Sequence, residues 1–282
     1  MVKRALALLL LTTGCQSIAG IDDVTLADAG AVDGTSNEVS DTLSETTPGE
    51  TLPPADTMPG ETVGCASSRG PTMVQITHAK GSYCIDSTEV SKEQYDAFRA
   101  ATKPSLKLPE RCTGLTLDYQ AVGGDSKIAQ HNVTWCEAYV FCAWAGKRLC
   151  GAIDSTQPLE PKNSEWMFAC SQGNTTKYPY GDTYSATSCV NGAGSGPNAV
   201  GSAAECKGAA APYDALYDMS GNVSEWVDEC VGSECHALGG YYGDSDVEAL
   251  SCTSVVAVDG GTATVALNVK ERLQGLGFRC CR

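Results

Sequence analysis

Residues Ala215–Trp226 read ALYDMSGNVSEW, and this stretch says more about the fold than any other part of the chain. Its centre holds Gly221, whose missing side chain permits a tight backbone turn. Asp218 and Glu225 flank that turn, so their carboxylates and the carbonyl oxygens between them can converge on one hard cation. Oxygen ligands of this kind suit calcium. The alternative is that Asp218 caps the turn while Glu225 forms a surface ion pair.

The segment upstream predicts a strand followed by a helix. Residues Tyr83–Val90 alternate enough to form a strand. Ser91 and Gln94 then form a capping box ahead of apolar residues at helical spacing, which predicts a capped amphipathic helix.

A second helix is predicted within Cys136–Leu149. We expect Tyr139, Cys142 and Trp144 to face mostly inward, and Gly146 suits the C-terminal cap of that helix. A further helical segment covers Ser164–Cys170 after an insertion rich in Gly, Ser, Thr and Pro.

Together these segments resemble the formylglycine-generating (sulfatase-modifying factor) family. The resemblance rests on Ala215–Trp226, on Val133–Leu149, on Asn198–Ser202 and on the closing Leu276–Cys280, and it runs over nearly all of Tyr83 to Cys280. It implies an α+β, C-type-lectin-like fold with few regular elements, long loops and many disulfides.

The resemblance also implies two disulfides and a calcium ligand set. The disulfides are Cys142–Cys280 and Cys170–Cys252, with Cys281 in place of Cys280 as the alternative. Calcium would take the side chains of Asp218 and Glu225 and the carbonyls of Gly221 and Val223. Asn191 sits where the family places a second calcium, although the acidic partner expected downstream is not evident.

The family's enzymes are thought to oxidise a substrate cysteine with molecular oxygen and a copper(I) ion held between two thiolates. Aligned on Gly239-Gly240, the two thiolate positions fall on Asp244 and Ala249, and neither residue offers the soft ligand that copper(I) requires. We therefore expect neither formylglycine generation nor copper binding.

Four residues replace the lip of the family's active site and are candidates for ligand binding: Tyr241, Tyr242, Asp244 and Asp246. The alternative is that both tyrosines pack inside. Cys230 and Cys235 have the spacing of the family's catalytic pair but precede the glycines, so a displaced redox or copper site competes there with a small disulfide loop.

The N-terminus has the order of a secretory signal: Lys3 and Arg4, then an apolar run too short to span a bilayer. Thr12-Thr13-Gly14-Cys15 resembles the bacterial lipobox, which implies cleavage of a signal at residues 1–14 and a lipid on Cys15. The alternative is an ordinary cleaved signal that leaves Cys15 as a spare thiol. Gln16 after that cysteine favours the outer membrane.

Composition divides the remainder into a linker and one domain. The stretch Gln16–Gly64 has ten acidic residues and neither Lys nor Arg, so residues 15–64 are predicted to be a disordered, lipid-anchored linker. Residues 65–282 are long enough for one sizeable core. Its mild acidity and lack of basic runs exclude nucleic acid as an expected partner.

Cysteine usage fits an oxidising compartment. The chain has 15 cysteines, and removing a lipidated Cys15 leaves an even number for disulfides, whereas no C-x-x-C spacing suggests zinc. The sequence thus favours an envelope lipoprotein whose domain binds a carbohydrate, peptide or protein. The alternatives are a thiol-oxidising enzyme with a rearranged site and a purely structural envelope component.

Overall fold

The computed structural model describes residues 64–154, 160, 162–192, 194–255 and 267–282. The chain separates into two compact units, Met1–Thr57 and Met58–Arg282, and every described residue belongs to the second. The predicted signal at 1–14, the lipidation site Cys15 and residues 15–63 of the predicted linker lie outside the described residues.

The first sheet has four strands in the order β1-β2-β8-β3. Strands β1 (Met73–His78) and β2 (Gly81–Asp86) form an antiparallel hairpin, while β8 (Cys280–Cys281) and β3 (Arg148–Leu149) complete the sheet. The strand predicted at 83–90 ends earlier, at Asp86. Its partner β1 begins at Met73 directly opposite, so no neighbour continues the pairing beyond that residue.

The second sheet has the order β6-β5-β4-β7. Strands β4 (Ser224–Val231) and β5 (Glu234–Leu238) form a hairpin, and β6 (Leu267–Asn268) pairs with β5. Strand β7 (Leu276–Phe278) runs parallel to β4.

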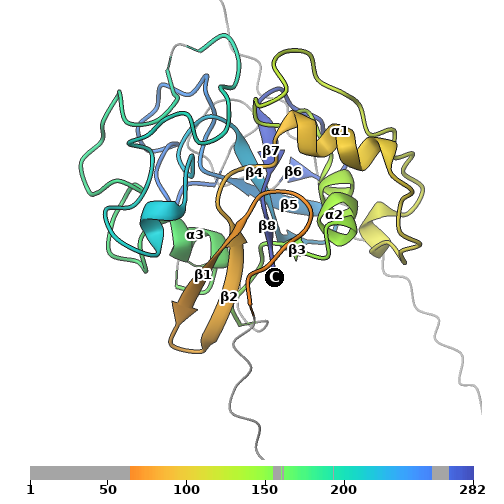
Figure 1. Ribbon diagram of the computed structural model, residues 1–282, viewed down its shortest axis with the longest axis horizontal. Coiled ribbons are helices and arrows are strands. Elements are labelled where there is room, and N and C mark those ends of the chain that lie inside the picture. Colours follow the sequence, from red (N-terminus) through yellow and green to blue (C-terminus); the bar gives the residue numbers. More distant parts are fainter. Residues whose placement is uncertain (1–63, 155–159, 161, 193, 256–266) are drawn as a thin grey trace, which may run out of the picture. The chain divides into compact units, whose positions relative to one another are not determined.

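The closing strand predicted at 276–280 is divided between the two sheets. Its first part is β7 and its last residue begins β8, with Arg279 between them. One continuous segment therefore ties the two sheets together at Arg279 (Figure 1).

Helix α1 (Lys92–Ala100) confirms the predicted capping box, because the Ser91 side chain accepts from the Gln94 backbone and the Gln94 side chain accepts from the Ser91 backbone. Helix α2 (Trp135–Trp144) has a second capping box, built by Thr134 and Glu137. As predicted, the helix ends at Gly146: α2 stops at Trp144, Ala145 follows it, and the φ of 72° at Gly146 is the left-handed conformation common after a helix.

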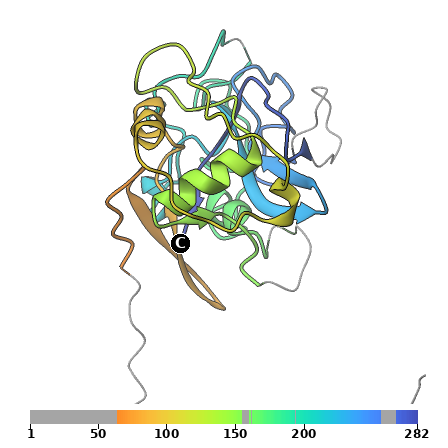
Figure 2. The same cartoon turned by 90° about the vertical axis from the view of Figure 1, so that its right-hand side faces the viewer.

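Helix α2 is buried on nearly every side rather than on one face. As predicted, Cys142 is buried, and Tyr139 and Trp144 are half-buried with their side chains packed against the core. The helix lies beside the second sheet (Figure 2), where the Trp135 indole donates to the Val227 carbonyl and the Trp226 indole donates to the Val133 carbonyl. These reciprocal bonds fix α2 against β4.

Three short helices complete the described elements: α3 (Glu165–Cys170), η1 (Glu110–Cys112) and η2 (Tyr213–Ala215). Figure 1 shows α3 on the opposite side of the strands from α1 and α2. Long loops connect these elements, which confirms the predicted α+β fold with few regular elements. Within the described ranges, no helix has the length and apolar character needed to cross a membrane.

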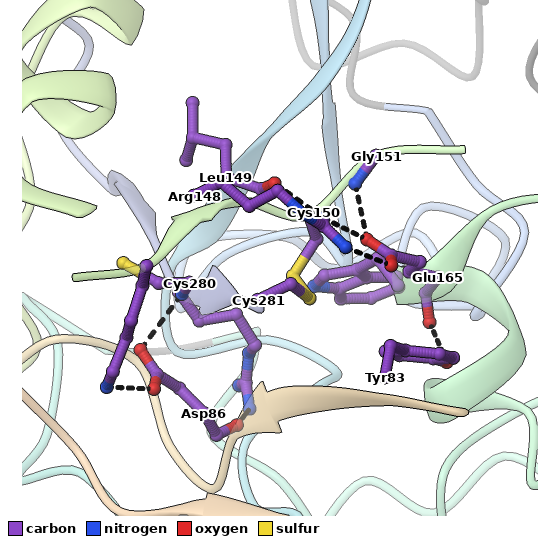
Figure 3. Close-up of a disulfide and its surroundings, with 12 residues drawn as sticks. Tyr83, Asp86, Arg148, Leu149, Cys150, Gly151, Glu165, Cys280 and Cys281 are labelled. Carbon is purple, nitrogen blue, oxygen red and sulfur yellow. Dashed lines mark hydrogen bonds and ion pairs between the residues drawn. A yellow bond between two sulfur atoms is a disulfide. The ribbon is translucent and has the colours of Figure 1, made fainter. Parts of the chain in front are cut away.

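Seven disulfides join all the described cysteines. Cys142–Cys280 and Cys170–Cys252, the two pairs that the family resemblance implied, are both present. Cys281 bonds Cys150 beside the first of these pairs (Figure 3), so the vicinal cysteines at the end of β8 anchor two different elements. The remaining pairs are Cys65–Cys84, Cys112–Cys136, Cys189–Cys206 and Cys230–Cys235.

Candidate functional site

Glu225 lies at the centre of a buried ion pair. Arg279 donates from Nε to Glu225 Oε2 at 2.6 Å and from Nη2 to Oε1 at 2.8 Å. The Trp166 indole donates to the same Oε2 at 2.7 Å. Both charged side chains are essentially fully buried, so the pair is held away from water and both carboxylate oxygens have donors.

The other donors of Arg279 reach backbone carbonyls. Nη1 donates to Asp86 at 3.0 Å and Nη2 to Tyr217 at 2.8 Å. The guanidinium thus joins β2, the segment before the Gly221 turn, and β4. This arrangement gives Arg279 a structural role at the junction of the two sheets.

Asp218 lies near the same arginine, but its carboxylate binds the backbone of the loop at Gly201. Its Oδ2 accepts from the Gly201 backbone N–H at 2.5 Å, and its backbone has a φ of 60°. Burial raises the pKa of Asp218 to about 6. The buried carboxyl of Glu89 is close by, and burial together with the charge of Asp218 raises the pKa of Glu89 well above its usual range.

The turn between these acids is closed by packing and backbone bonds. A Cβ added to Gly221 would lie 2.1 Å from the Val190 carbonyl oxygen, so only glycine fits. The Gly221 N–H donates to the Gly239 carbonyl at 2.8 Å, and Val223 is buried.

This donor set does not fit a calcium ion. The ion would need Glu225, whose carboxylate is already bound by Arg279 and Trp166, and a cation beside the Arg279 guanidinium would meet like charge. Within the ranges that the structure describes, no group of three or more His, Cys, Asp or Glu side chains is placed to hold a metal. Neither interpretation of Glu225 predicted Arg279 as its partner, and burial of the carboxylate contradicts the alternative of a surface ion pair.

Asn191 is also occupied by its surroundings. The Tyr184 hydroxyl donates to its Oδ1 at 3.0 Å, and its Nδ2 donates to the Cys189 carbonyl at 3.2 Å. The amide therefore holds its own loop.

Positions 244 and 249 are brought together around Gly240. A Cβ built on Gly240 would lie 3.0 Å from the Asp244 Oδ2 atom and 2.9 Å from the Ala249 carbonyl oxygen. Asp244 uses the same Oδ2 to accept from the Tyr241 backbone N–H at 2.9 Å, which closes a turn. Burial raises the pKa of Asp244.

The remaining lip residues have largely internal contacts. Tyr242 is buried, with its ring against Gly194, while Tyr241 is half-buried and its ring covers Gly243 and Gly275. The two rings meet edge to face at 5.1 Å. Asp246 is half-buried and accepts from the Glu248 backbone N–H at 2.9 Å. Tyr241, Asp244 and Asp246 therefore retain exposed surface, and Asp244 already uses its carboxylate within its own turn.

Residues 57–282 match the Sulfatase-modifying factor enzyme 1-like domain family. This match spans most of the chain. The protein belongs to that sulfatase-modifying factor family.

One curated relative is the bovine (Bos taurus) inactive C-alpha-formylglycine-generating enzyme 2. The two sequences are 28% identical over 166 residues, a span that covers 53% of this chain and 48% of the relative. The match thus spans about half the length of that protein.

Solved structures with a similar fold include Treponema denticola variable protein 1, with 18% identity, 74% of this chain and 94% of that chain covered, and a TM-score of 0.48. PvdO from Pseudomonas aeruginosa has 16% identity, coverage of 77% and 98%, and a TM-score of 0.49. CarF has 22% identity, coverage of 77% and 96%, and a TM-score of 0.43.

In this sulfatase-modifying factor domain, both positions aligned with the catalytic thiolates place an oxygen atom beside Gly240. Asp244 supplies a hard carboxylate oxygen and Ala249 only its backbone carbonyl, so this pair does not fit copper(I). Sequence reasoning found these positions but missed Arg279 as the partner of Glu225. That arginine lies in the string LGFR near the C-terminus, and no local signal in the sequence marks it as the partner of Glu225.

Proposed function

We propose that this protein is a non-catalytic sulfatase-modifying factor domain that acts by binding a ligand at the bacterial cell surface. The observation that carries this proposal is the pair of residues beside Gly240. Where a formylglycine-generating enzyme needs two thiolates, Asp244 closes a turn and Ala249 offers a carbonyl oxygen. Every described cysteine is also consumed in a disulfide, which leaves no thiolate in that part of the chain to replace them.

The name of the bovine relative supports the same proposal, because that protein is called inactive. The domain lacks the two thiolates, but Arg279 still joins its two sheets. The sheets therefore form a rigid base for the long loops. Loops on a rigid base are well suited to binding, and the exposed parts of Tyr241 and Asp246 are the first candidates for contact with a carbohydrate, peptide or protein.

A lipid on Cys15 would hold this domain at the outer membrane, with the acidic linker as a spacer. Metabolic labelling with a fatty-acid probe and fractionation of the membranes test this part of the proposal. The full-length protein is expected to carry the label and to sediment with outer-membrane markers, whereas Cys15→Ser is expected to lose both properties. Labelled or sedimenting Cys15→Ser protein would contradict lipidation at that residue.

The catalytic part is tested with a cysteine-containing sulfatase peptide, copper(I) and oxygen. Mass spectrometry is expected to show no conversion of the peptide cysteine to formylglycine by the natural protein. The matched variant Asp244→Cys/Ala249→Cys places thiols at the two adjacent positions, and it serves as the positive control for copper(I) binding. Peptide conversion by the natural protein would overturn the proposal.

The binding part is tested with immobilised envelope polysaccharides and peptidoglycan fragments as probes. Saturable binding that Asp246→Ala weakens, with an unchanged melting temperature, is the expected result. Asp182→Ala, at an exposed acidic residue on another loop, is the control and is expected to leave binding unaltered. Failure of every carbohydrate probe would direct the search to peptide and protein ligands.

A further inference from the structure

We infer that the Cys230–Cys235 disulfide is a thiol–disulfide exchange site that accepts a thiolate from solution. The pair lies across the β4–β5 hairpin, where Cys230 and Cys235 occupy directly opposed positions. This inference is independent of the proposed binding function, because it uses none of the lip residues.

Only one of the two cysteines of the hairpin disulfide, Cys230, is accessible to solvent. Cys230 is half-buried and the next residue, Val231, is 78% exposed, whereas Cys235 is fully buried. A hollow of about 330 Å³ lined by Pro109, Glu110, Arg111 and Gly232 adjoins the hairpin turn. An incoming thiolate can therefore approach Cys230 far more readily than Cys235.

A fixed positive charge lies against the buried sulfur. Arg111 donates from Nη1 to Cys235 Sγ at 3.4 Å. Its guanidinium lies 5.1 Å from the centre of the Trp135 ring, and the neighbouring Cys112 is bonded to Cys136 at the start of α2. These two restraints hold the cation in place, and a nearby arginine favours the thiolate form of a cysteine.

The other sulfur faces the opposite charge. Cys230 Sγ lies 3.9 Å from the Asp228 carboxylate, and Arg111 also attracts that carboxylate. The hairpin thus places a carboxylate beside the accessible sulfur and a guanidinium beside the buried one. In an exchange reaction, the sulfur whose thiolate is more stable is the better leaving group. The guanidinium stabilises the Cys235 thiolate, so this asymmetry favours departure of Cys235.

The reaction that follows from this geometry is balanced. A substrate thiolate attacks Cys230 Sγ, a mixed disulfide forms at Cys230, and the bond to Cys235 breaks to leave a thiolate beside Arg111. A second substrate thiolate attacks the substrate sulfur of the mixed disulfide and releases Cys230 as a thiolate. Two substrate thiols are oxidised to one disulfide, the protein takes up two electrons, and an oxidised low-molecular-weight disulfide restores the pair by the reverse reaction.

The other six described disulfides provide internal comparisons. Five of them join two buried cysteines. Cys65–Cys84 resembles the hairpin pair in exposure, because Cys65 is half-buried and Cys84 is buried. It also closes a longer loop, with a sequence separation of 19 against 5 for the hairpin pair. Breaking Cys65–Cys84 therefore gives the unfolded chain more conformational entropy and costs the folded protein more stability. The strands of the β4–β5 hairpin remain paired by backbone bonds when their disulfide opens.

The test is reduction of the folded protein in graded glutathione buffers, followed by alkylation and peptide mapping. Cys230 and Cys235 are expected to be reduced at a glutathione ratio about tenfold less reducing than Cys65–Cys84 requires. Cys235→Ser is expected to accumulate glutathione on Cys230, and a cysteine-containing peptide in place of glutathione shows whether protein thiols react as well. Equal resistance of the two disulfides would overturn the inference, as would no adduct on Cys230.

Arg111 is tested as a positioning residue with two variants. Arg111→Gln is expected to slow the exchange about tenfold, since it removes the charge that favours the leaving thiolate. Arg111→Lys retains the charge and is expected to recover most of the rate. Equal rates for the natural protein and Arg111→Gln would contradict the role of the guanidinium, and a glutamine-like rate for Arg111→Lys would show that shape rather than charge is responsible.

Discussion

Arg279 binds both carboxylate oxygens of Glu225 inside the molecule, with Nε–Oε2 at 2.6 Å and Nη2–Oε1 at 2.8 Å. The arginine is the residue between β7 and β8, and the glutamate lies near the start of β4. This ion pair occupies the place where the sequence alone predicts calcium. It therefore determines both how the Gly221 turn is held and which experiments distinguish the two accounts.

Removing one partner of this pair leaves a buried charge without compensation. Glu225→Gln is expected to lower the free energy of unfolding by about 3–5 kcal/mol, measured by urea denaturation. Glu248→Gln is the matched control, because its partner Lys177 and the glutamate are both exposed and such pairs contribute about 0–1 kcal/mol. A similar loss in the free energy of unfolding for the two variants would show that Glu225 and Arg279 do not form a buried ion pair.

Metal removal should leave the domain unaltered. Because Glu225 is bound by Arg279 and Trp166, extensive dialysis against a calcium chelator is expected to leave the melting temperature unchanged. Calcium titrated back should likewise produce no shift in differential scanning calorimetry. A lower melting temperature that calcium alone restores would establish the ion and would require Glu225 to exchange its arginine for the metal.

Acidification should stabilise the domain through Glu229. Burial raises the pKa of its carboxyl to about 7, and its Oε1 lacks a hydrogen-bond partner in the described part of the chain. The folded protein therefore binds this proton more tightly than the unfolded chain. Below the pKa of Glu229 in the unfolded chain, its burial costs no stability from ionisation. The free energy of unfolding then falls as the pH rises toward 7, and the loss stays constant at higher pH.

Glu229→Gln should remove this dependence. At pH 8 the variant is expected to be more stable than the natural protein by on the order of 1–3 kcal/mol, and near pH 4 the two should be equal. Chemical denaturation at a series of pH values provides the measurement. A variant that is less stable at pH 8 would mean that the carboxylate is stabilised by its surroundings.

The disulfides should differ in their contributions according to the chain that each one encloses. Cys142–Cys280 has a sequence separation of 138 and Cys230–Cys235 a separation of 5. Loop-closure entropy predicts losses of about 5 and about 2 kcal/mol for the two double alanine variants. Denaturation of both variants under oxidising conditions checks the order, and a larger loss for the hairpin variant would contradict it.

Local signals in the sequence predicted local structure well. Ser91 and Gln94 form their capping box because both partners lie within one helical turn. The closing strand was predicted as one element because nothing within Leu276–Cys280 indicates that it changes sheets at Arg279. Two disulfides came from the family resemblance, which contains long-range information that spacing lacks.

The contacts that define the site are long-range and could not be predicted in this way. Glu225 meets Arg279 across 54 residues, and Arg111 meets Cys235 across 124 residues. A charged side chain in a sequence carries no indication of whether it will be buried or which opposite charge it will meet. The alternative interpretation of Glu225 as a surface residue was wrong for that reason.

A non-catalytic domain requires that residues 65–282 contain no free pair of thiolates. The measurement is the intact mass of the membrane-extracted protein after alkylation without reduction, with peptide mapping of any adduct. We predict no alkyl group on any cysteine of residues 65–282, because all 14 are joined in seven disulfides. An alkylated pair other than Cys230 and Cys235 in the freshly extracted protein would contradict the non-catalytic function and would identify the thiols on which an oxidase could be built.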